Sequence, residues 1–267
     1  FVYIQDTIKN YPLMENIINR VDCVCHFAGV AEPDQYVETP RKVIDVTAIA
    51  GLKLIEMCRV KGKLFFYTST SEIYGKNTKI PFSEDDDRVL GSTNTNRWCY
   101  SSSKALMEHY LNACAQTREL DSIIVRLFNV YGPRLQGRAV SNFINLALTG
   151  EEIIIHGDGK QTRAFTYIDD VIDAFYKLIA TKECINNIYN VGNPIETSIE
   201  VLAKTVLEKT GNKSKSKFMT HTDYYGESYE DIGRRVPDIS RIKKYIGWEP
   251  TTSLEDGVGK TVDYYRK

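Results

Sequence analysis

The stretch Lys63-Leu-Phe-Phe-Tyr-Thr-Ser-Thr-Ser-Glu-Ile-Tyr-Gly75 shows how this chain is built. Its first six residues are mostly apolar and fit a short buried strand, while the polar residues that follow lead to a glycine turn. Two other short runs, 22–28 and 122–128, have the same character. Helix-period segments at 41–60 and 100–117 separate the runs. This order predicts a doubly wound α/β fold with a parallel sheet.

The sequence pattern changes after Gly132-Pro133, where shorter predicted helices and strands follow one another. We predict a larger domain from residues 1–130 and 164–193. A smaller α+β lobe is predicted from residues 131–163 and 194–267. Ligands of doubly wound sheets bind beyond the carboxyl ends of the strands, so the segments after the strands are the places to look for chemistry.

Charge and composition exclude several function classes. The 267 residues carry 34 basic and 35 acidic side chains, a net charge of -1. This balance gives no electrostatic support for binding nucleic acid or a membrane surface. No apolar run reaches the ~20 residues of a membrane span. The six cysteines lack paired zinc-ligand spacing, which predicts no metal site and reduced thiols in a cytoplasmic protein.

The pair Tyr100 and Lys104 begins the second helix-period segment. An i, i+4 spacing places both side chains on one helical face. A nearby ammonium favours the tyrosinate, which can take a proton from a sugar hydroxyl while hydride leaves the same carbon. Taken alone, the pattern is better explained as an ordinary surface pair of a tyrosine and a lysine. Its setting, between residues 69–75 and 126–134 that each follow a strand, favours an active site.

Together these three segments resemble the extended short-chain dehydrogenase/reductase family of nucleotide-sugar epimerases, dehydratases and decarboxylases. The resemblance covers essentially the whole chain and extends to further motifs, which are Gly157-Asp-Gly-Lys-Gln-Thr-Arg-Ala-Phe-Thr-Tyr-Ile-Asp-Asp170, Tyr189-Asn-Val-Gly192, Arg234-Arg-Val-Pro-Asp238 and Gly247-Trp-Glu-Pro250. It implies a Rossmann-like sheet with a smaller substrate lobe.

The family opens with a strand, a glycine-rich turn and a helix that binds the cofactor pyrophosphate. Here Gly29 is the first glycine, so the N-terminal βαβ unit with the glycine turn is missing. The resemblance makes 1–6 the third strand of the family's sheet. We therefore expect a protein of roughly 310 residues from which one β-α-β unit is absent.

The resemblance implies NAD as the cofactor, with NADP left open. Asp6 would contact adenine. Tyr100 and Lys104 would serve both the cofactor and the reaction, with Lys104 on the nicotinamide ribose. The other residues expected along the cofactor are Ala28, Gly29, Val30, Tyr67, Thr68 and Phe128.

The catalytic residues expected from the resemblance are Thr70, Ser71, Glu72, Tyr100, Lys104 and Arg235. Thr70 would hydrogen-bond the reacting hydroxyl, and Tyr100 would be the general base. The Ser71-Glu72 pair is like that of UDP-glucuronate decarboxylases, although GDP-mannose dehydratases share it. Arg235 matches a family arginine that acts on the substrate carboxylate or on the enolate formed when CO2 leaves. The alternative, that Arg235 is an ordinary surface arginine, is held nearly even with this role.

Substrate binding is expected from Thr70, Asn129, Arg138, Arg163 and Arg235. Asn129 and Arg163 would hold the pyrophosphate of a nucleotide sugar, which we expect to be UDP-linked. Arg138 either assists there or is an ordinary surface arginine. The leading prediction is a UDP-glucuronate decarboxylase that oxidises C4, loses CO2 and makes UDP-xylose or the 4-keto pentose. A 4-epimerase or 4,6-dehydratase is the runner-up, and a silent dinucleotide-binding protein or inactive fragment is the alternative of another class. A homodimer through segments 41–60 and 100–117 is also expected.

Overall fold

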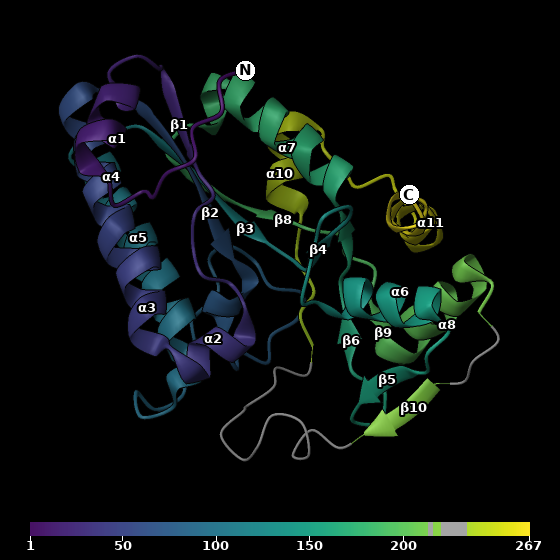
Figure 1. The fold of residues 1–267 in the computed structure, drawn as a ribbon. Helices are drawn as coiled ribbons and strands as arrows, with labels where there is room; N and C mark the ends of the chain where they lie inside the picture. Colours follow the sequence, from purple (N-terminus) through teal and green to yellow (C-terminus); the bar gives the residue numbers. More distant parts are fainter. Residues whose placement is uncertain (213–215, 220–233) are drawn as a thin grey trace. The chain divides into compact units, whose positions relative to one another are not determined.

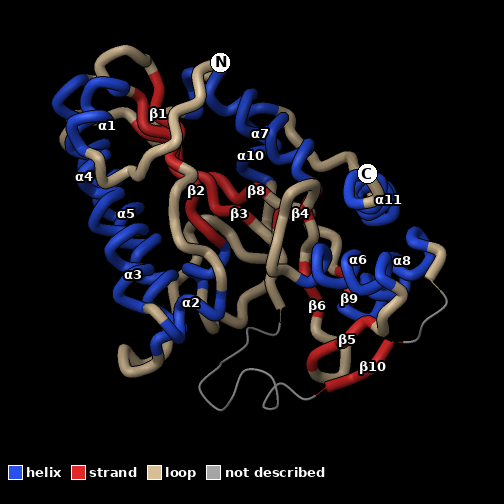
Figure 2. Tube along the Cα trace, in the orientation of Figure 1, coloured by secondary structure: helices blue, strands red, loops and turns tan. Residues whose placement is uncertain are grey.

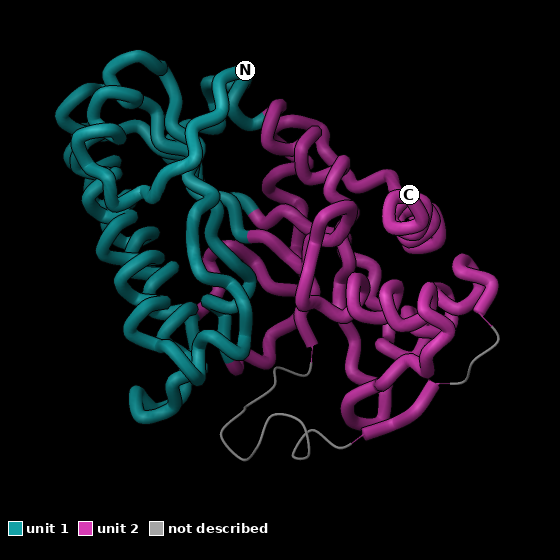
Figure 3. The backbone as a smooth tube through the Cα atoms, in the orientation of Figure 1, with its two compact units in different colours: residues 1–75, 88–126, 178–189 teal, residues 76–87, 127–177, 190–267 magenta. Residues whose placement is uncertain are grey.

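The computed structural model describes residues 1–212, 216–219 and 234–267. The chain divides into two compact units, shown in Figure 3. Unit 1 comprises residues 1–75, 88–126 and 178–189, and unit 2 comprises residues 76–87, 127–177 and 190–267.

Unit 1 is built on a four-stranded sheet with the order β1-β2-β3-β8 (Figures 1 and 2). The strands are β1 (Cys23–His26), β2 (Leu64–Thr70), β3 (Ser122–Leu127) and β8 (Asn187–Val191); β3 and β8 run on past the boundaries of the unit. β1 and β2 pair in parallel, with Cys23 opposite Leu64. The predicted parallel α/β sheet is therefore confirmed.

One helix of unit 1 precedes β1, and the other helices and helical turns lie between the strands in the sequence. They are α1 (Tyr11–Ile18), α2 (Pro33–Glu38), α3 (Pro40–Ile44), the π-helical turn η1 (Asp45–Ile49), α4 (Ala50–Lys61), the 3-10 turns η2 (Ser71–Tyr74) and η3 (Asn96–Trp98), α5 (Cys99–Gln116), and the 3-10 turn η4 (Lys182–Cys184). Leu54, Ile55, Phe65 and Leu111 are buried in one core between helices and sheet. The long apolar faces expected at 41–60 and 100–117 thus pack as helices against the sheet.

The predicted strand at residues 1–6 is wrong. These residues are assigned to no strand, and Phe1, Val2 and Tyr3 are exposed. An extended segment becomes a strand only when a neighbouring strand satisfies its backbone groups. Among the described residues, β1 pairs with β2 alone, so apolar alternation by itself does not make 1–6 a strand here.

Unit 2 packs helices against short strand pairs around a core that includes Phe143, Ile155, Leu202 and Val258. Its elements are β4 (Val130–Tyr131), α6 (Ala139–Thr149), β5 (Ile153–His156), β6 (Thr162–Arg163), β7 (Thr166–Tyr167), α7 (Ile168–Ala180), β9 (Thr197–Ser198), α8 (Ile199–Thr210), β10 (Ser216–Met219), α10 (Ser240–Ile246) and α11 (Leu254–Tyr265). β4 pairs with β7, β10 with β5, and β6 with β9. In the described part of the chain, no helix has the length and apolarity needed to cross a membrane.

Candidate active site

The end of β2 turns directly into the predicted catalytic segment. Thr70 caps the 3-10 turn η2 with its side chain, since its Oγ1 accepts a hydrogen bond from the backbone nitrogen of Glu72 at 3.2 Å. Thr70, Ser71 and Glu72 are all buried. A hydroxyl residue at the cap position satisfies a backbone N–H that the turn would otherwise leave without a partner. The local sequence therefore explains why these three polar side chains are held together in one tight turn.

Glu72 is joined to an arginine that the sequence analysis did not select. Nη1 of Arg97, in η3, donates to Oε2 of Glu72 at 2.7 Å. The side chains are 1% and 10% exposed, respectively. A hint was present in the sequence, because Arg97-Trp98 stands just ahead of Tyr100, but nothing in the spacing indicates that residue 97 reaches residue 72.

Tyr100 and Lys104 lie one turn apart on one face at the start of α5, as the i, i+4 spacing predicts. The Tyr100 ring stacks on Tyr36 with 4.7 Å between ring centroids. Nζ of Lys104 lies 5.9 Å from the Tyr100 ring centroid and 4.9 Å from that of Tyr67. The two side chains therefore share one buried place at the start of the helix.

Lys104 is a buried cation with spare donor capacity. Its Nζ donates to the carbonyl oxygen of Thr68 at 2.7 Å, the one hydrogen bond that it makes within the described residues. An ammonium has three N–H donors. Burial lowers the pKa of Lys104 to about 8, while the Glu108 carboxylate acts in the opposite direction. At neutral pH the group is still largely protonated, as a partner for the tyrosinate must be.

The turn after β1 lies beside this lysine. A Cβ added to Gly29 would stand 3.6 Å from Nζ of Lys104 and 3.6 Å from Oγ1 of Thr47. The backbone nitrogen of Val30 donates to Oγ1 of Thr47 at 3.3 Å. Thr47 is buried within the π-helical turn η1, an irregularity that is frequent at functional sites. It stands where the family resemblance places an asparagine, and it holds the turn 28–30 in place.

Asp6 makes local contacts in unit 1. Its carboxylate accepts hydrogen bonds from the backbone nitrogen of Thr7 at 2.7 Å and from Nδ2 of Asn10 at 2.8 Å. Asn10 in turn caps helix α1. The described contacts of Asp6 thus organise the entry into α1, and its expected role at adenine stays a prediction.

Phe128 and Asn129 follow β3 and belong to unit 2. The carbonyl oxygen of Phe128 accepts a hydrogen bond from Oγ1 of Thr166 at 2.9 Å. Asn129 has a φ of +36°, which few residues other than glycine, asparagine and aspartate adopt. A Cβ at Gly192 would stand 2.7 Å from Cβ of Phe128, so this approach requires a glycine. The backbone is held tightly at the position where the predicted site residues Phe128 and Asn129 occur.

The three predicted arginines of unit 2 lie on separate segments. Arg138 is the cap residue of α6 and is half-buried, as is Arg163 in β6. Nη1 of Arg163 donates to the carbonyl oxygen of Thr162 at 2.8 Å. Arg235 is buried. Burial makes a purely solvated surface role a poor description of Arg235.

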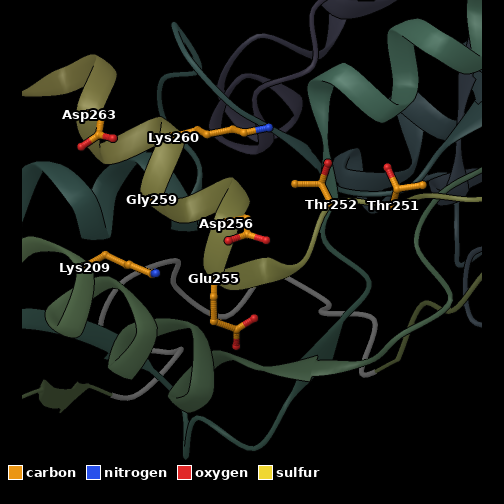
Figure 4. A pocket seen from close by; sticks show the side chains of 8 residues that line it. All are labelled: Lys209, Thr251, Thr252, Glu255, Asp256, Gly259, Lys260 and Asp263. Atoms are coloured by element: carbon orange, nitrogen blue, oxygen red, sulfur yellow. The ribbon is translucent and has the colours of Figure 1, made fainter.

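One surface cavity, shown in Figure 4, lies elsewhere in unit 2. Its volume is about 460 Å³, and it is lined by Lys209, Thr251, Thr252, Glu255, Asp256, Gly259, Lys260 and Asp263. None of the predicted site residues lines it. Across the described residues, no group of three or more His, Cys, Asp or Glu side chains has a metal-binding arrangement.

Comparison with known proteins adds independent findings. The sequence model of the family described as "NAD dependent epimerase/dehydratase family" matches residues 4–192. A "UDP-N-acetyl-alpha-D-glucosaminuronate decarboxylase" from Bacillus cytotoxicus is 35% identical over 260 residues, which are 95% of this chain and 79% of that protein. "UDP-glucuronic acid decarboxylase 1" from Xenopus tropicalis is 34% identical over 263 residues, 97% of this chain. The chain spans 60% of the length of that relative.

Two solved structures have the same fold. The UDP-glucose 4-epimerase of Thermotoga maritima, with UDP-glucose, superimposes with a TM-score of 0.88 at 30% identity and covers 99% of this chain and 84% of its own. The UDP-glucuronic acid 4-epimerase of Bacillus cereus, in complex with UDP-glucuronic acid and NAD, has a TM-score of 0.88 at 26% identity, covering 100% and 82%. The Rossmann-like fold class is confirmed by both.

Proposed function

The chain belongs to the NAD-dependent epimerase/dehydratase family, and from this premise we propose that it decarboxylates a UDP-linked uronic acid. The observation that carries the proposal is the buried turn Thr70-Ser71-Glu72 in the same unit as Tyr100 and Lys104. The two decarboxylases named above, each about a third identical to this chain, support the same reaction class. UDP-glucuronate is the first substrate to test, and its 2-acetamido counterpart the second.

In the proposed reaction, Tyr100 takes the proton of the C4 hydroxyl while the C4 hydrogen leaves as hydride. Lys104 stabilises the tyrosinate, and Thr70 hydrogen-bonds the reacting hydroxyl. A bound NAD would supply the hydride acceptor for this oxidation and the hydride donor for the final reduction at C4. The resulting 4-keto uronic acid is a β-keto acid: the bond between C5 and the carboxyl carbon breaks, CO2 leaves, and the electron pair forms an enolate. Protonation at C5 then gives the 4-keto pentose.

The residues around Lys104 fit the nicotinamide-ribose half of NAD. A buried ammonium with spare N–H donors lies beside a glycine, an arrangement suited to a ribose hydroxyl. We propose that Ala28, Gly29 and Val30 line the cofactor together with Tyr67 and Thr68. No glycine-rich turn precedes Gly29 in the sequence, so we propose no residue for the pyrophosphate.

For unit 2 we propose substrate binding. Arg235 is assigned to the uronic acid carboxylate, since a guanidinium pairs with a carboxylate through two parallel hydrogen bonds. Asn129 and Arg163 are assigned to the diphosphate, and Arg138 to a supporting role there. The proposed ligand-binding domains differ in their bounds from the two compact units: residues 1–130 and 164–193 would hold the dinucleotide, and residues 131–163 and 194–267 the nucleotide sugar.

We further propose a cytoplasmic homodimer. Ile44, Ile49, Val60 and Leu106 are large apolar side chains that stand exposed on or beside α3, α4 and α5. A second copy of these helices would bury them. All six cysteines have free thiols, which supports a reducing compartment.

A 4-epimerase is the second candidate. Both solved structures described above are 4-epimerases, one of them in complex with a uronic acid nucleotide. An epimerase shares the oxidation at C4 but retains the carboxylate and returns hydride to the opposite face. The two candidates therefore differ in whether CO2 leaves.

The deciding experiment is a panel of nucleotide sugars incubated with the full-length protein and NAD, read by NMR and CO2 release. We expect CO2 from a UDP-uronate, and Arg235→Ala should slow its release about 10- to 100-fold, because a hydrogen bond to a charged group is worth ~1.5–3 kcal/mol. Arg234→Ala is the matched control, since Arg234 pairs with Glu196 on the surface. Turnover of UDP-uronates to C4 epimers without CO2 would replace the decarboxylase by the epimerase.

A further inference from the structure

The buried pair of Arg97 and Glu72 is a feature for which the proposed reaction does not yet account. Its hydrogen bond is 2.7 Å long, and the arginine side chain is almost completely closed to solvent. The residues are 25 positions apart and come from two different 3-10 turns of unit 1, η2 and η3. The guanidinium also lies over the Trp98 ring, 5.3 Å from its centroid.

Stability alone is a poor reason for such a pair. Removing two charges from water costs several kcal/mol for each ion, and apolar residues of similar volume often stabilise a protein equally well or better. A site that keeps both charges buried is therefore better explained by something that the charges do.

The position of Arg97 indicates which function the buried pair serves. The arginine stands three residues before Tyr100, directly ahead of α5. Its partner Glu72 is held at its backbone by Thr70. One side chain thus connects the turn that carries Thr70, Ser71 and Glu72 to the start of the helix that carries the proposed general base.

The chemistry of the pair narrows the role of Glu72. A guanidinium stays protonated at every pH that proteins tolerate, and it favours the ionised form of an adjacent carboxylate. An ionised carboxylate accepts hydrogen bonds or protons and has none to donate. Of the two side chains, Glu72 is the one that retains some exposed area, 10% against 1% for Arg97.

We infer that Arg97 is a positioning residue that keeps Glu72 ionised and fixed in orientation, so that Glu72 acts on the sugar as an anionic acceptor rather than as an acid. This inference rests on the proposed function and on the catalytic role that the family resemblance implies for Glu72. It makes Arg97 part of the reaction without contact between Arg97 and the substrate.

The test is a double-mutant cycle in the full-length protein, made of Glu72→Gln, Arg97→Met and the two combined, with Arg97→Lys as the conservative variant. We expect Arg97→Met to lower kcat about 10- to 100-fold with little change in KM, and to move the acid limb of the kcat profile to higher pH. Arg97→Lys should restore part of the rate. The combined variant should be no slower than Glu72→Gln, because Arg97 acts through Glu72.

Loss of fold is separated from loss of function in two ways. The combined variant removes both charges of the pair, so neither is left buried without the other. Its rate can therefore be compared with that of Glu72→Gln even if Arg97→Met alone unfolds. Arg126→Lys weakens another buried pair of unit 1, with Glu108, and should lower the melting temperature without moving the acid limb. An unshifted acid limb in Arg97→Lys and Arg97→Met, or a combined variant more than tenfold slower than Glu72→Gln, would overturn the inference.

Failure of the proposed function has a different signature. If the wild-type protein turns over some nucleotide sugar without CO2 release, decarboxylation is rejected and the cycle is measured on that substrate. If the wild-type protein turns over no nucleotide sugar, both the proposed function and the role of Arg97 are rejected together.

Discussion

Unit 1 has two ion pairs in which both side chains are buried, whereas two ion pairs of unit 2 are open to solvent. In unit 1, Arg97 and Glu72 are buried, and so are Arg126 and Glu108, whose bidentate hydrogen bonds measure 3.1 and 2.7 Å. In unit 2, the pair of Arg234 and Glu196 has side chains that are 58% and 26% exposed. The ion pair of Lys243 and Glu249 is likewise open to solvent.

This difference has an energetic meaning. Exposed ion pairs contribute ~0–1 kcal/mol and can rearrange at little cost, whereas breaking one partner of a buried pair costs ~3–5 kcal/mol. The two buried pairs of unit 1 should therefore resist rearrangement more strongly than the exposed pairs of Arg234 with Glu196 and of Lys243 with Glu249 in unit 2.

Glu108→Gln should give the largest effect on stability. It leaves the Arg126 guanidinium buried opposite a neutral amide, and we expect the free energy of unfolding to fall by about 3–5 kcal/mol. Arg126 also donates to the hydroxyl of Tyr74 at 2.9 Å, so the turn η2 should loosen as well. Chemical denaturation measures the change. A decrease of less than about 1 kcal/mol in the free energy of unfolding would contradict the proposed difference between buried and exposed ion pairs.

Lys104→Met tests whether a buried charge in unit 1 serves function rather than stability. We expect turnover to fall about 100-fold or more. The free energy of unfolding at pH 7 should stay within about 1 kcal/mol of wild type or increase, because the variant removes a desolvated ammonium. Steady-state kinetics and thermal unfolding of the same preparation give both values. A stability loss as large as that of Glu108→Gln would contradict this division of roles.

The pH dependence of stability provides a second readout on Lys104. Burial lowers its pKa to about 8 from the ordinary value of 10.5. Between these values the native state binds fewer protons than the unfolded state, so this residue makes the free energy of unfolding rise with pH through that window. We expect the rise of the free energy of unfolding with pH to become less steep in Lys104→Met. Lys53→Met, at an exposed position of α4, is the control and should leave this dependence unchanged.

Glu196→Gln should give the smallest effect. The hydrogen bond from Arg234 lowers the pKa of Glu196 against the opposing effect of burial. The contribution of the pair is therefore present at neutral pH and disappears as the pH falls below about 4.5, the ordinary value for a glutamic acid. We expect a loss of at most about 1 kcal/mol in urea denaturation and activity within about threefold of wild type. A larger effect would show that the segment with Arg235 depends on the ion pair of Arg234 and Glu196.

The local geometry of part of the site could be predicted because its members are close in sequence. Thr70, Ser71 and Glu72 follow one strand, and Tyr100 and Lys104 lie on one helical face. Their roles come from the family resemblance and stay predictions. Arg97 and Thr47 were missed as contributors because their partners, Glu72 and Val30, are 25 and 17 residues away. Local patterns do not specify which distant groups meet in a folded chain.

By itself, the sequence determined the order of most strands and helices, because apolar periodicity and turn residues act over a few positions. The family was identified by the resemblance of its motifs to those of known enzymes. It did not determine that residues 1–6 stay outside the sheet, since strand formation depends on a neighbour and not only on alternation. Only the tertiary structure decided that Arg97 meets Glu72 and that Lys104 is enclosed. Burial and charge pairing depend on every element that packs around a group, and these are properties of the whole fold.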